Sequence, residues 1–283
     1  MAISVRTLTD AEYVALRFCL IKQFEGRSAT PYYPNQADRL ANNLTIGYGF
    51  NLNGSQFIRN AVLGAIYPNS NDPTRQRLAG EMRTPAGLRR LEGDARLTMT
   101  DAQMRTAFDT LMDAQSNHAY EQIVNNWLQL QVAIPRSYER AVLVSLAYNG
   151  GERLLGQRLC AALTRARAAT DVEGMAQDRA EAWYEIRYNS GNQYRRRIIE
   201  SEVFGLYENA AAVTAEDARG VYSVYTRHNR QGNGSNSNYM NTAWDRARGT
   251  AFTNANADIA VINAELARRN AGITISQASG LQD

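Results

Sequence analysis

The chain has 283 residues, of which 44% are hydrophobic and 21% are charged, and its formal net charge at pH 7 is +3. This is the composition of a globular protein, so it excludes wholesale disorder and the fibrous classes. No apolar run approaches the roughly 18 residues of a membrane span, and the scattered basic residues match no nucleic-acid-binding module. We therefore expect neither a membrane span nor a nucleic-acid partner.

The residues that most often hold metals or form disulfides are few. Cys19 and Cys160 are too few for a disulfide framework. His118 and His228 lie far apart in the sequence and outside any Cys/His cluster, so we expect no metal site. No phosphate-binding or dinucleotide-binding glycine motif is present, and we expect no cofactor. The sequence start, MAISVRTLTD, predicts no classical signal peptide.

The first predicted element is a helix with a clear start and end. Thr9 and Glu12 have the spacing of a capping box, in which each side chain bonds the backbone N–H of the other residue. Apolar residues then recur at helical spacing up to Gly26, a residue type common just after a helix. This pattern places Glu25 at the helix C-terminus.

The next segment, residues 27–54, is rich in turn formers and aromatic residues. Its run from Leu44 to Phe50 is short, contains β-branched and aromatic residues, and is interrupted by two glycines. This pattern predicts a strand or the edge of a hairpin. This is the only β-type pattern that we find, so the predicted fold class is α+β, mostly α.

The rest of the chain is predicted to be mostly helical. Thr100 is expected to cap a helix, and the run from Ala141 to Tyr148 is apolar nearly all round, which is typical of a helix in the middle of a core. A polar loop is expected over 230–238 and a frayed tail from Ile273. Further helices are predicted over 55–67, 155–169, 171–187, 193–207, 214–228 and 254–270.

Several short motifs occur in the order found in one enzyme family. They are Ile21–Gly26, Leu44–Gly49, Arg140–Gly151, Trp183 and Tyr194–Glu200. With these motifs the chain resembles the phage-type lysozymes, glycoside hydrolase family 24, over roughly residues 10–208. The resemblance implies a two-lobed lysozyme-like fold, with a small β-containing lobe, a helical lobe and a substrate cleft. It implies a catalytic domain over 1–208, followed by a helical C-terminal extension over 209–283.

The resemblance also implies an activity, hydrolysis of the β-1,4 bond between N-acetylmuramic acid and N-acetylglucosamine in peptidoglycan. Such a reaction needs one group to protonate the leaving oxygen and another to activate water or stabilise the oxocarbenium ion. In the family a helix-terminal glutamate is the acid and a threonine that opens the TIG motif positions the water. The matching residues here are Glu25 and Thr45.

One residue departs from the family pattern of tyrosine, any residue, then aspartate. Here Tyr33 and Pro34 are followed by Asn35, and the nearest acid is Asp38. Three alternatives follow. Asp38 reaches the base position, or Asn35 holds the water with Thr45 and there is no strong base. In the third, either a carboxylate from elsewhere substitutes or the site is inactive. A second departure is Phe50, where many relatives have a histidine.

Other side chains are candidates for substrate binding. Tyr32, Tyr33 and Tyr48 are expected either to stack on sugar rings or to pack, and Asn149 either to bond in the cleft or to cap its helix. Trp183 is expected in the core rather than on a sugar. One of Arg195, Arg196 and Arg197 is expected to orient Glu25; at most one or two of them can face the cleft, and the others are expected to be solvated.

The biological setting stays open between two kinds of lysozyme. One is a phage endolysin or virion lysin, released by a holin or carried in the particle. The other is an antibacterial effector of a type VI secretion system, whose partner would be a cognate immunity protein. Both act on the periplasmic or extracellular cell wall, and we expect a monomer.

The alternative functions are those of a lytic transglycosylase, an enzyme that acts on chitin or chitosan, and a non-catalytic peptidoglycan-binding module. The extension is expected to dock on the catalytic domain or to bind the wall or a partner.

Overall fold

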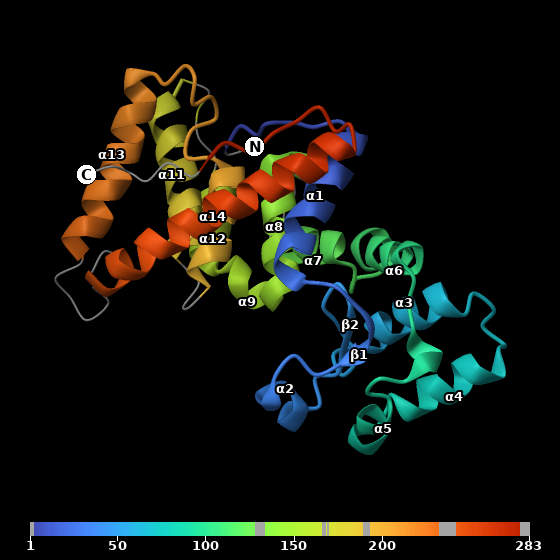
Figure 1. The fold of residues 1–283 in the computed structure, drawn as a ribbon. Helices are drawn as coiled ribbons and strands as arrows, with labels where there is room; N and C mark the ends of the chain where they lie inside the picture. The colour runs from blue at the N-terminus through green and yellow to red at the C-terminus, as the bar shows by residue number, and fades with distance from the viewer. Residues whose placement is uncertain are drawn as a thin grey trace. The chain divides into compact units, whose positions relative to one another are not determined.

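A computed structural model describes residues 3–127, 134–165, 168, 170–188, 193–231 and 242–277. Within these residues the chain is mostly helical and contains one three-stranded antiparallel sheet (Figure 1). The expectation of a mostly helical α+β protein is therefore confirmed. No helix among the described residues is both long and apolar enough to cross a membrane.

The chain forms two compact units. Unit 1 consists of Met1–Ile21 and Val124–Asp283, and unit 2 is Lys22–Ile123. Helix α1 (Asp10–Glu25) contributes residues to both. It begins as expected, because the Glu12 carboxylate accepts the Thr9 N–H at 2.7 Å and the Glu12 N–H donates to the Thr9 hydroxyl at 3.3 Å. It ends before Gly26, whose φ of +68° suits glycine.

Unit 2 contains the sheet. Strands β1 (Ser28–Tyr32), β2 (Thr45–Gly47) and β3 (Phe50–Asn51) pair in that order, all antiparallel. The expected strand from Leu44 to Phe50 is thus a hairpin whose turn contains Tyr48 and Gly49. The other elements of unit 2 are α2 (Gln36–Ala41), α3 (Gln56–Ile66), α4 (Pro73–Glu81), α5 (Pro85–Arg90), the 3-10 helix η1 (Ala95–Leu97), α6 (Asp101–Asp113) and the start of α7 (Tyr120–Trp127).

The core of unit 2 lies where α3 packs on α6. Thr100 caps α6 through a capping box with Gln103, which confirms the predicted start of this helix. Phe108 of α6 is fully buried, and the ring of Tyr48 meets it edge-on with ring centroids 6.3 Å apart. The hairpin is therefore held on the helices by aromatic packing.

Unit 1 is built around α8 (Tyr138–Gly150), which is buried from Glu139 to Ala147 and so confirms the predicted core helix. Gly156, with φ +42°, separates two helices where one was expected over 155–169. The last helix begins twelve residues earlier than expected, at Thr242 rather than 254. The other helices of unit 1 are α9 (Glu152–Leu155), α10 (Gln157–Thr164), α11 (Val172–Tyr188), α12 (Tyr194–Phe204), α13 (Ala215–Gln231) and α14 (Thr242–Arg268).

The described part of the expected C-terminal extension belongs to unit 1 and packs on other helices of that unit. Helix α13 contacts α11, and α14 crosses over α12 and contacts it (Figure 1). The tail after α14 is not frayed at Ile275, because Asn263 bonds its N–H at 2.7 Å and its C=O at 2.8 Å. The expectation of a frayed tail is wrong there, and residues 278–283 lie outside the described part. A catalytic domain ending at residue 208 stays a prediction.

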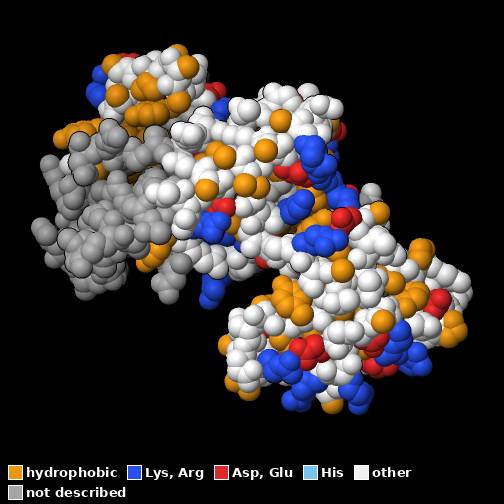
Figure 2. Space-filling view, in the orientation of Figure 1, with side chains coloured by type: hydrophobic (Ala, Val, Ile, Leu, Met, Phe, Trp, Pro, Cys, Tyr) orange, Lys and Arg blue, Asp and Glu red, His pale blue; other side chains and the backbone are white. Residues whose placement is uncertain are grey.

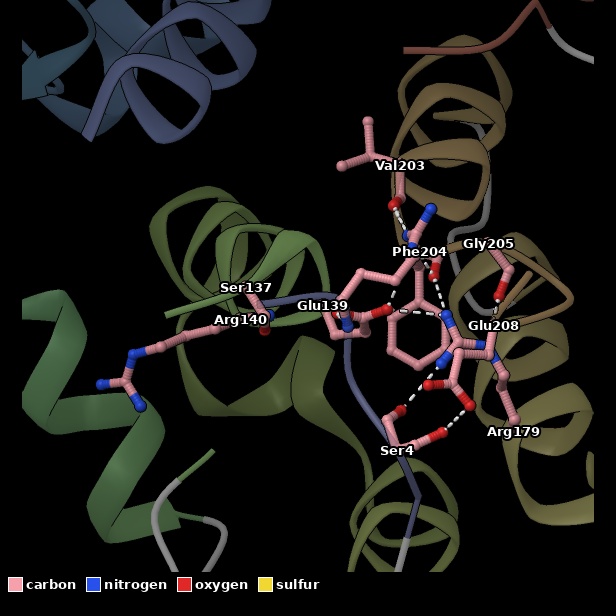
Figure 3. A network of polar contacts seen from close by, with 10 residues as sticks. Ser4, Ser137, Glu139, Arg140, Arg179, Val203, Phe204, Gly205 and Glu208 are labelled. Atoms are coloured by element: carbon pink, nitrogen blue, oxygen red, sulfur yellow. Dashed lines mark hydrogen bonds and ion pairs between the residues drawn. The ribbon is translucent and has the colours of Figure 1, made fainter. Parts of the chain in front are cut away.

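A buried ionic cluster joins four segments of unit 1 (Figure 3). Glu139 of α8 has no exposed surface, and it accepts bonds from Arg6 at 3.0 Å and from Arg179 of α11 at 2.7 Å. Arg179 also donates to the carbonyl groups of Phe204 and Gly205 at 2.7 and 3.0 Å. Burial lowers the pKa of Arg179. The paired charges offset one another's desolvation and tie α8, α11 and the end of α12 to the N-terminal segment.

Candidate active site

Glu25 is positioned by two glycines of unit 2. Gly26 ends α1 directly after it, and Gly49 of the β2–β3 turn lies against its side chain. Gly49 has a φ of +81°, and a Cβ added there would lie 2.7 Å from Glu25 Oε2 and 3.2 Å from Glu25 Cβ. Only glycine leaves room for this approach. The Glu25 carboxyl group is therefore in direct contact with the hairpin backbone.

The charge of Glu25 acts on two tyrosines of unit 2, Tyr120 and Tyr32. The pKa of Tyr120 is raised to about 12, mainly by burial and to a smaller extent by the negative charge of Glu25. The pKa of Tyr32 is also raised, mainly by burial and to a smaller extent by the negative charges of Glu25 and Asp38. Both phenols therefore stay protonated at neutral pH and can donate hydrogen bonds. The sequence offered no signal for Tyr120, because it begins α7 and is far from Glu25 in the chain.

Asp38 is held by two amide side chains. Asn35 is the N-cap of α2, and its Oδ1 accepts the Asp38 N–H at 2.9 Å while its Nδ2 donates to Asp38 Oδ2 at 2.6 Å. The Asn43 amide donates to the other carboxylate oxygen of Asp38 at 3.2 Å. Asn35 thus orients both the helix and Asp38.

Asn43 links Asp38 to the sheet. Its Oδ1 accepts a bond from Asn51 at 3.2 Å, and its main-chain carbonyl accepts one from the Thr45 hydroxyl at 3.1 Å. Tyr32 pairs with Thr45 across β1 and β2, and Thr45 pairs with Asn51 across β2 and β3. Directly paired residues project from the same face of a sheet. Tyr32, Thr45 and Asn51 therefore form one row, which Asn43 and Asp38 extend. We did not expect Asn43 and Asn51 in this position from the sequence.

The remaining expected substrate-binding residues lie elsewhere. Tyr48 is 4% exposed and packs edge-on against Phe50 and Phe108, which is the packing alternative. The ring of Tyr33 is covered by Arg39, whose guanidinium carbon lies 5.0 Å from its centroid. Its hydroxyl is buried without a hydrogen-bond partner in the described part of the chain, and burial raises its pKa.

Asn149 belongs to unit 1, near the end of α8, and its Oδ1 accepts a bond from Arg197 at 2.6 Å. Arg196 and Arg197 both pair with the buried carboxylate of Glu200. Arg195 pairs with Asp258 of α14. The side chains of Arg196 and Arg197 are 8% and 1% exposed, whereas that of Arg195 is 54% exposed, so the three consecutive arginines point in different directions as expected.

Within the described residues, no group of three or more His, Cys, Asp or Glu side chains is arranged to hold a metal ion. No protein-family model matches the sequence, no curated protein matches it, and no solved structure matches the fold. The resemblance to the phage-type lysozymes therefore depends on the motifs of the sequence alone.

Proposed function

We propose that the protein is a peptidoglycan muramidase, with Glu25 as its acid and Asp38 as its base. The observation that carries this proposal is the contact of the Glu25 side chain with Gly49, in the turn of the hairpin whose first strand begins at Thr45. Glycoside hydrolysis uses two carboxyl groups on either side of the scissile bond. Glu25 and Asp38 belong to the same unit, and after burial the charges of both raise the pKa of Tyr32.

The contacts of Asp38 favour it over Asn35 as the group that activates water. Both ends of the Asn35 amide are bonded to Asp38, so Asn35 orients the carboxylate. An amide also cannot accept a proton near neutral pH, whereas a carboxylate can. Thr45 donates its hydroxyl proton to the Asn43 carbonyl, which leaves its oxygen to accept a bond from the attacking water.

The proposal includes the two-lobed lysozyme-like arrangement and its setting. The substrate is the glycan of the periplasmic or extracellular cell wall, which the protein reaches as a phage lysin or as a secreted antibacterial effector. An effector of this kind needs a cognate immunity protein, whereas a phage lysin does not. No cofactor takes part in the proposed reaction.

A lytic transglycosylase is the second candidate, and one observation favours it. Both oxygens of Asp38 already accept amide hydrogen bonds, so an attacking water would have to share an oxygen with one of these donors. A transglycosylase needs an acid but no base that activates water, because the substrate's own hydroxyl attacks. The two reactions give products that differ by one water.

The test is mass spectrometry of the soluble products released from purified peptidoglycan. Glu25→Gln and Asp38→Asn are compared with the wild type, and Asp109→Asn serves as the matched control because this acid of unit 2 pairs only with Arg105 on its own helix. We expect free reducing ends from the wild type and the control, and a loss of at least about 10²-fold in Glu25→Gln. Products lighter by one water support the transglycosylase. Equal activity in Glu25→Gln contradicts both candidates.

A further inference from the structure

The Asp38 carboxylate is oriented by neutral amide groups rather than by a cation. Figure 2 shows Lys and Arg side chains gathered on the side of unit 2 where α2 and α5 lie. The neighbouring Arg39 nevertheless pairs with Glu92, and Asp38 forms no ion pair within the residues that the structure describes. Its oxygens accept bonds from Asn35 Nδ2 at 2.6 Å and from Asn43 Nδ2 at 3.2 Å. The orientation of the carboxylate therefore depends on how these two amides are themselves fixed.

The Asn43 amide is the middle of a chain of hydrogen bonds that begins in the main chain after β3. The N–H of Asn53 donates to Asn51 Oδ1 at 2.9 Å. Asn51 Nδ2 donates to Asn43 Oδ1 at 3.2 Å, and Asn43 Nδ2 donates in turn to Asp38 Oδ1. Asn51 is also fixed by the sheet, where it pairs with Thr45. The chain thus connects the backbone of a strand to the carboxylate.

This chain can run in one direction only. A main-chain N–H can only donate, so Asn51 turns its Oδ1 toward Asn53 and its Nδ2 toward Asn43. An ionised carboxylate can only accept, so Asn43 turns its Nδ2 toward Asp38. Reversing either amide alone would break both of its bonds, because two donors or two acceptors would then face each other. Both ends of the chain therefore require the same orientation of the two amides.

We propose that Asn51 is a positioning residue of the candidate active site, which acts on Asp38 through Asn43. The bond from Asn51 holds the Asn43 amide with its donor toward one carboxylate oxygen, while Asn35 holds the other oxygen. Two donors on two oxygens oppose rotation of the carboxylate, and a reacting group held in one orientation loses less entropy on the way to the transition state. That this carboxylate activates water rests on the proposed function, whereas its orientation by the chain does not.

Asn51→Asp is the decisive variant, because it reverses the chain at almost constant shape. The new carboxylate still accepts the Asn53 N–H but cannot donate to Asn43. The Asn43 amide then turns its donor toward residue 51 and its carbonyl toward Asp38. Asn51→Ala also removes the donor, but it leaves Asn43 able to keep its bond to Asp38. We expect product release from peptidoglycan to fall about tenfold in Asn51→Asp and at most about threefold in Asn51→Ala.

The order of the two variants separates positioning from a merely structural role. If Asn51 served only to hold the hairpin, Asn51→Ala would be the more harmful change, because it alone loses the bond to the Asn53 N–H. That order would overturn the proposal. Asn53→Ala is the matched control, since it removes an amide of the same segment but keeps the main-chain N–H that begins the chain. Urea unfolding shows that each variant is folded.

A double-mutant cycle separates the effect through Asn43 from a direct effect of the added charge. In a chain that already carries Asn43→Ala there is no amide to turn, so neither substitution of Asn51 should cause a further loss. The cycle with Asn51→Ala gives the same answer without any added charge. Equal losses with and without Asn43→Ala would overturn the proposal, because residue 51 would then act without the intervening amide.

A second measurement needs no activity. The side-chain amide signals of Asn43 are identified in a nuclear magnetic resonance spectrum by their loss in Asn43→Ala. Asp38→Ala should shift these signals in the otherwise wild-type chain, because it removes the acceptor of the amide. In a chain carrying Asn51→Asp the donor faces residue 51, so we expect the shift caused by Asp38→Ala to be at most about half as large.

These outcomes are distinct from a failure of the proposed function. If the wild type releases no products but the Asn43 signals lose their response to Asp38 in Asn51→Asp, the muramidase proposal fails and the positioning of Asp38 remains. If products are released and the response is the same with and without Asn51→Asp, the positioning proposal fails and the muramidase remains.

Discussion

The side chain of Glu25 lies directly against the backbone of Gly49. Gly49 has a left-handed φ of +81°, and a Cβ at this residue would lie 2.7 Å from the Glu25 carboxylate. The helix end and the hairpin turn thus share one point of contact, and the position of the carboxyl group depends on the absence of a side chain at residue 49.

Gly49→Ala tests this relationship. We expect it to destabilise the protein by about 1–2 kcal/mol, because alanine is strained at this φ, and to reduce product release by at least about tenfold, because the new methyl group displaces the general acid. Gly93→Ala is the control: its φ is +68°, but nothing lies within 4 Å of the added Cβ. Urea unfolding and product release are measured for both. Equal losses of activity in the two variants would show that the contact with Glu25 is unimportant.

Asn43→Ala tests the support of Asp38. The substitution removes one amide donor from the Asp38 carboxylate and the acceptor of Asn51. We expect kcat to fall about tenfold with a smaller change in KM, because positioning is lost in the reacting complex. Asn53→Ala, at a neighbouring exposed amide that bonds the Ala41 carbonyl, is the control. If Asn43→Ala keeps the wild-type kcat, Asp38 does not need this support.

Tyr120→Phe tests the buried phenol on which the charge of Glu25 acts. The pKa of Tyr120 is raised to about 12, above its ordinary value of 10, so the folded state keeps a proton that the unfolded state releases. The free energy of unfolding should therefore fall as pH rises from about 10 to about 12, by at most about 2.7 kcal/mol for a shift of this size. Urea unfolding between pH 9 and 11.5 should show a steeper decline for the wild type than for Tyr120→Phe. Parallel declines would contradict the raised pKa.

Deletion of residues 209–283 tests the role of the C-terminal helices. Ile259, Ile262 and Leu266 of α14 are at most 1% exposed, and α14 packs on α12. The deletion exposes the apolar surface that these residues cover, so we expect an aggregating or partly unfolded product, detected by light scattering and circular dichroism. Soluble protein with the wild-type unfolding midpoint would show that the extension is an independent appendage.

The sequence by itself determined the local elements. Local sequence signals within a few consecutive residues predicted four features correctly. They are the Thr9 and Glu12 capping box, the glycine after Glu25, the Thr100 cap and the apolar helix from Ala141 to Tyr148. The same local signals placed Glu25 at a helix end and Thr45 at the start of a strand.

Only the tertiary structure decided which side chains meet. The charge of Glu25 acts on Tyr120, Asn43 joins Asp38 to Thr45, and Trp183 lines a pocket together with residues of α13. These partners are far apart in the sequence or come from loops without periodicity, so no local pattern records them. Their positions follow from how helices and strands bury their apolar faces together, which is a property of the whole packed unit rather than of any single segment.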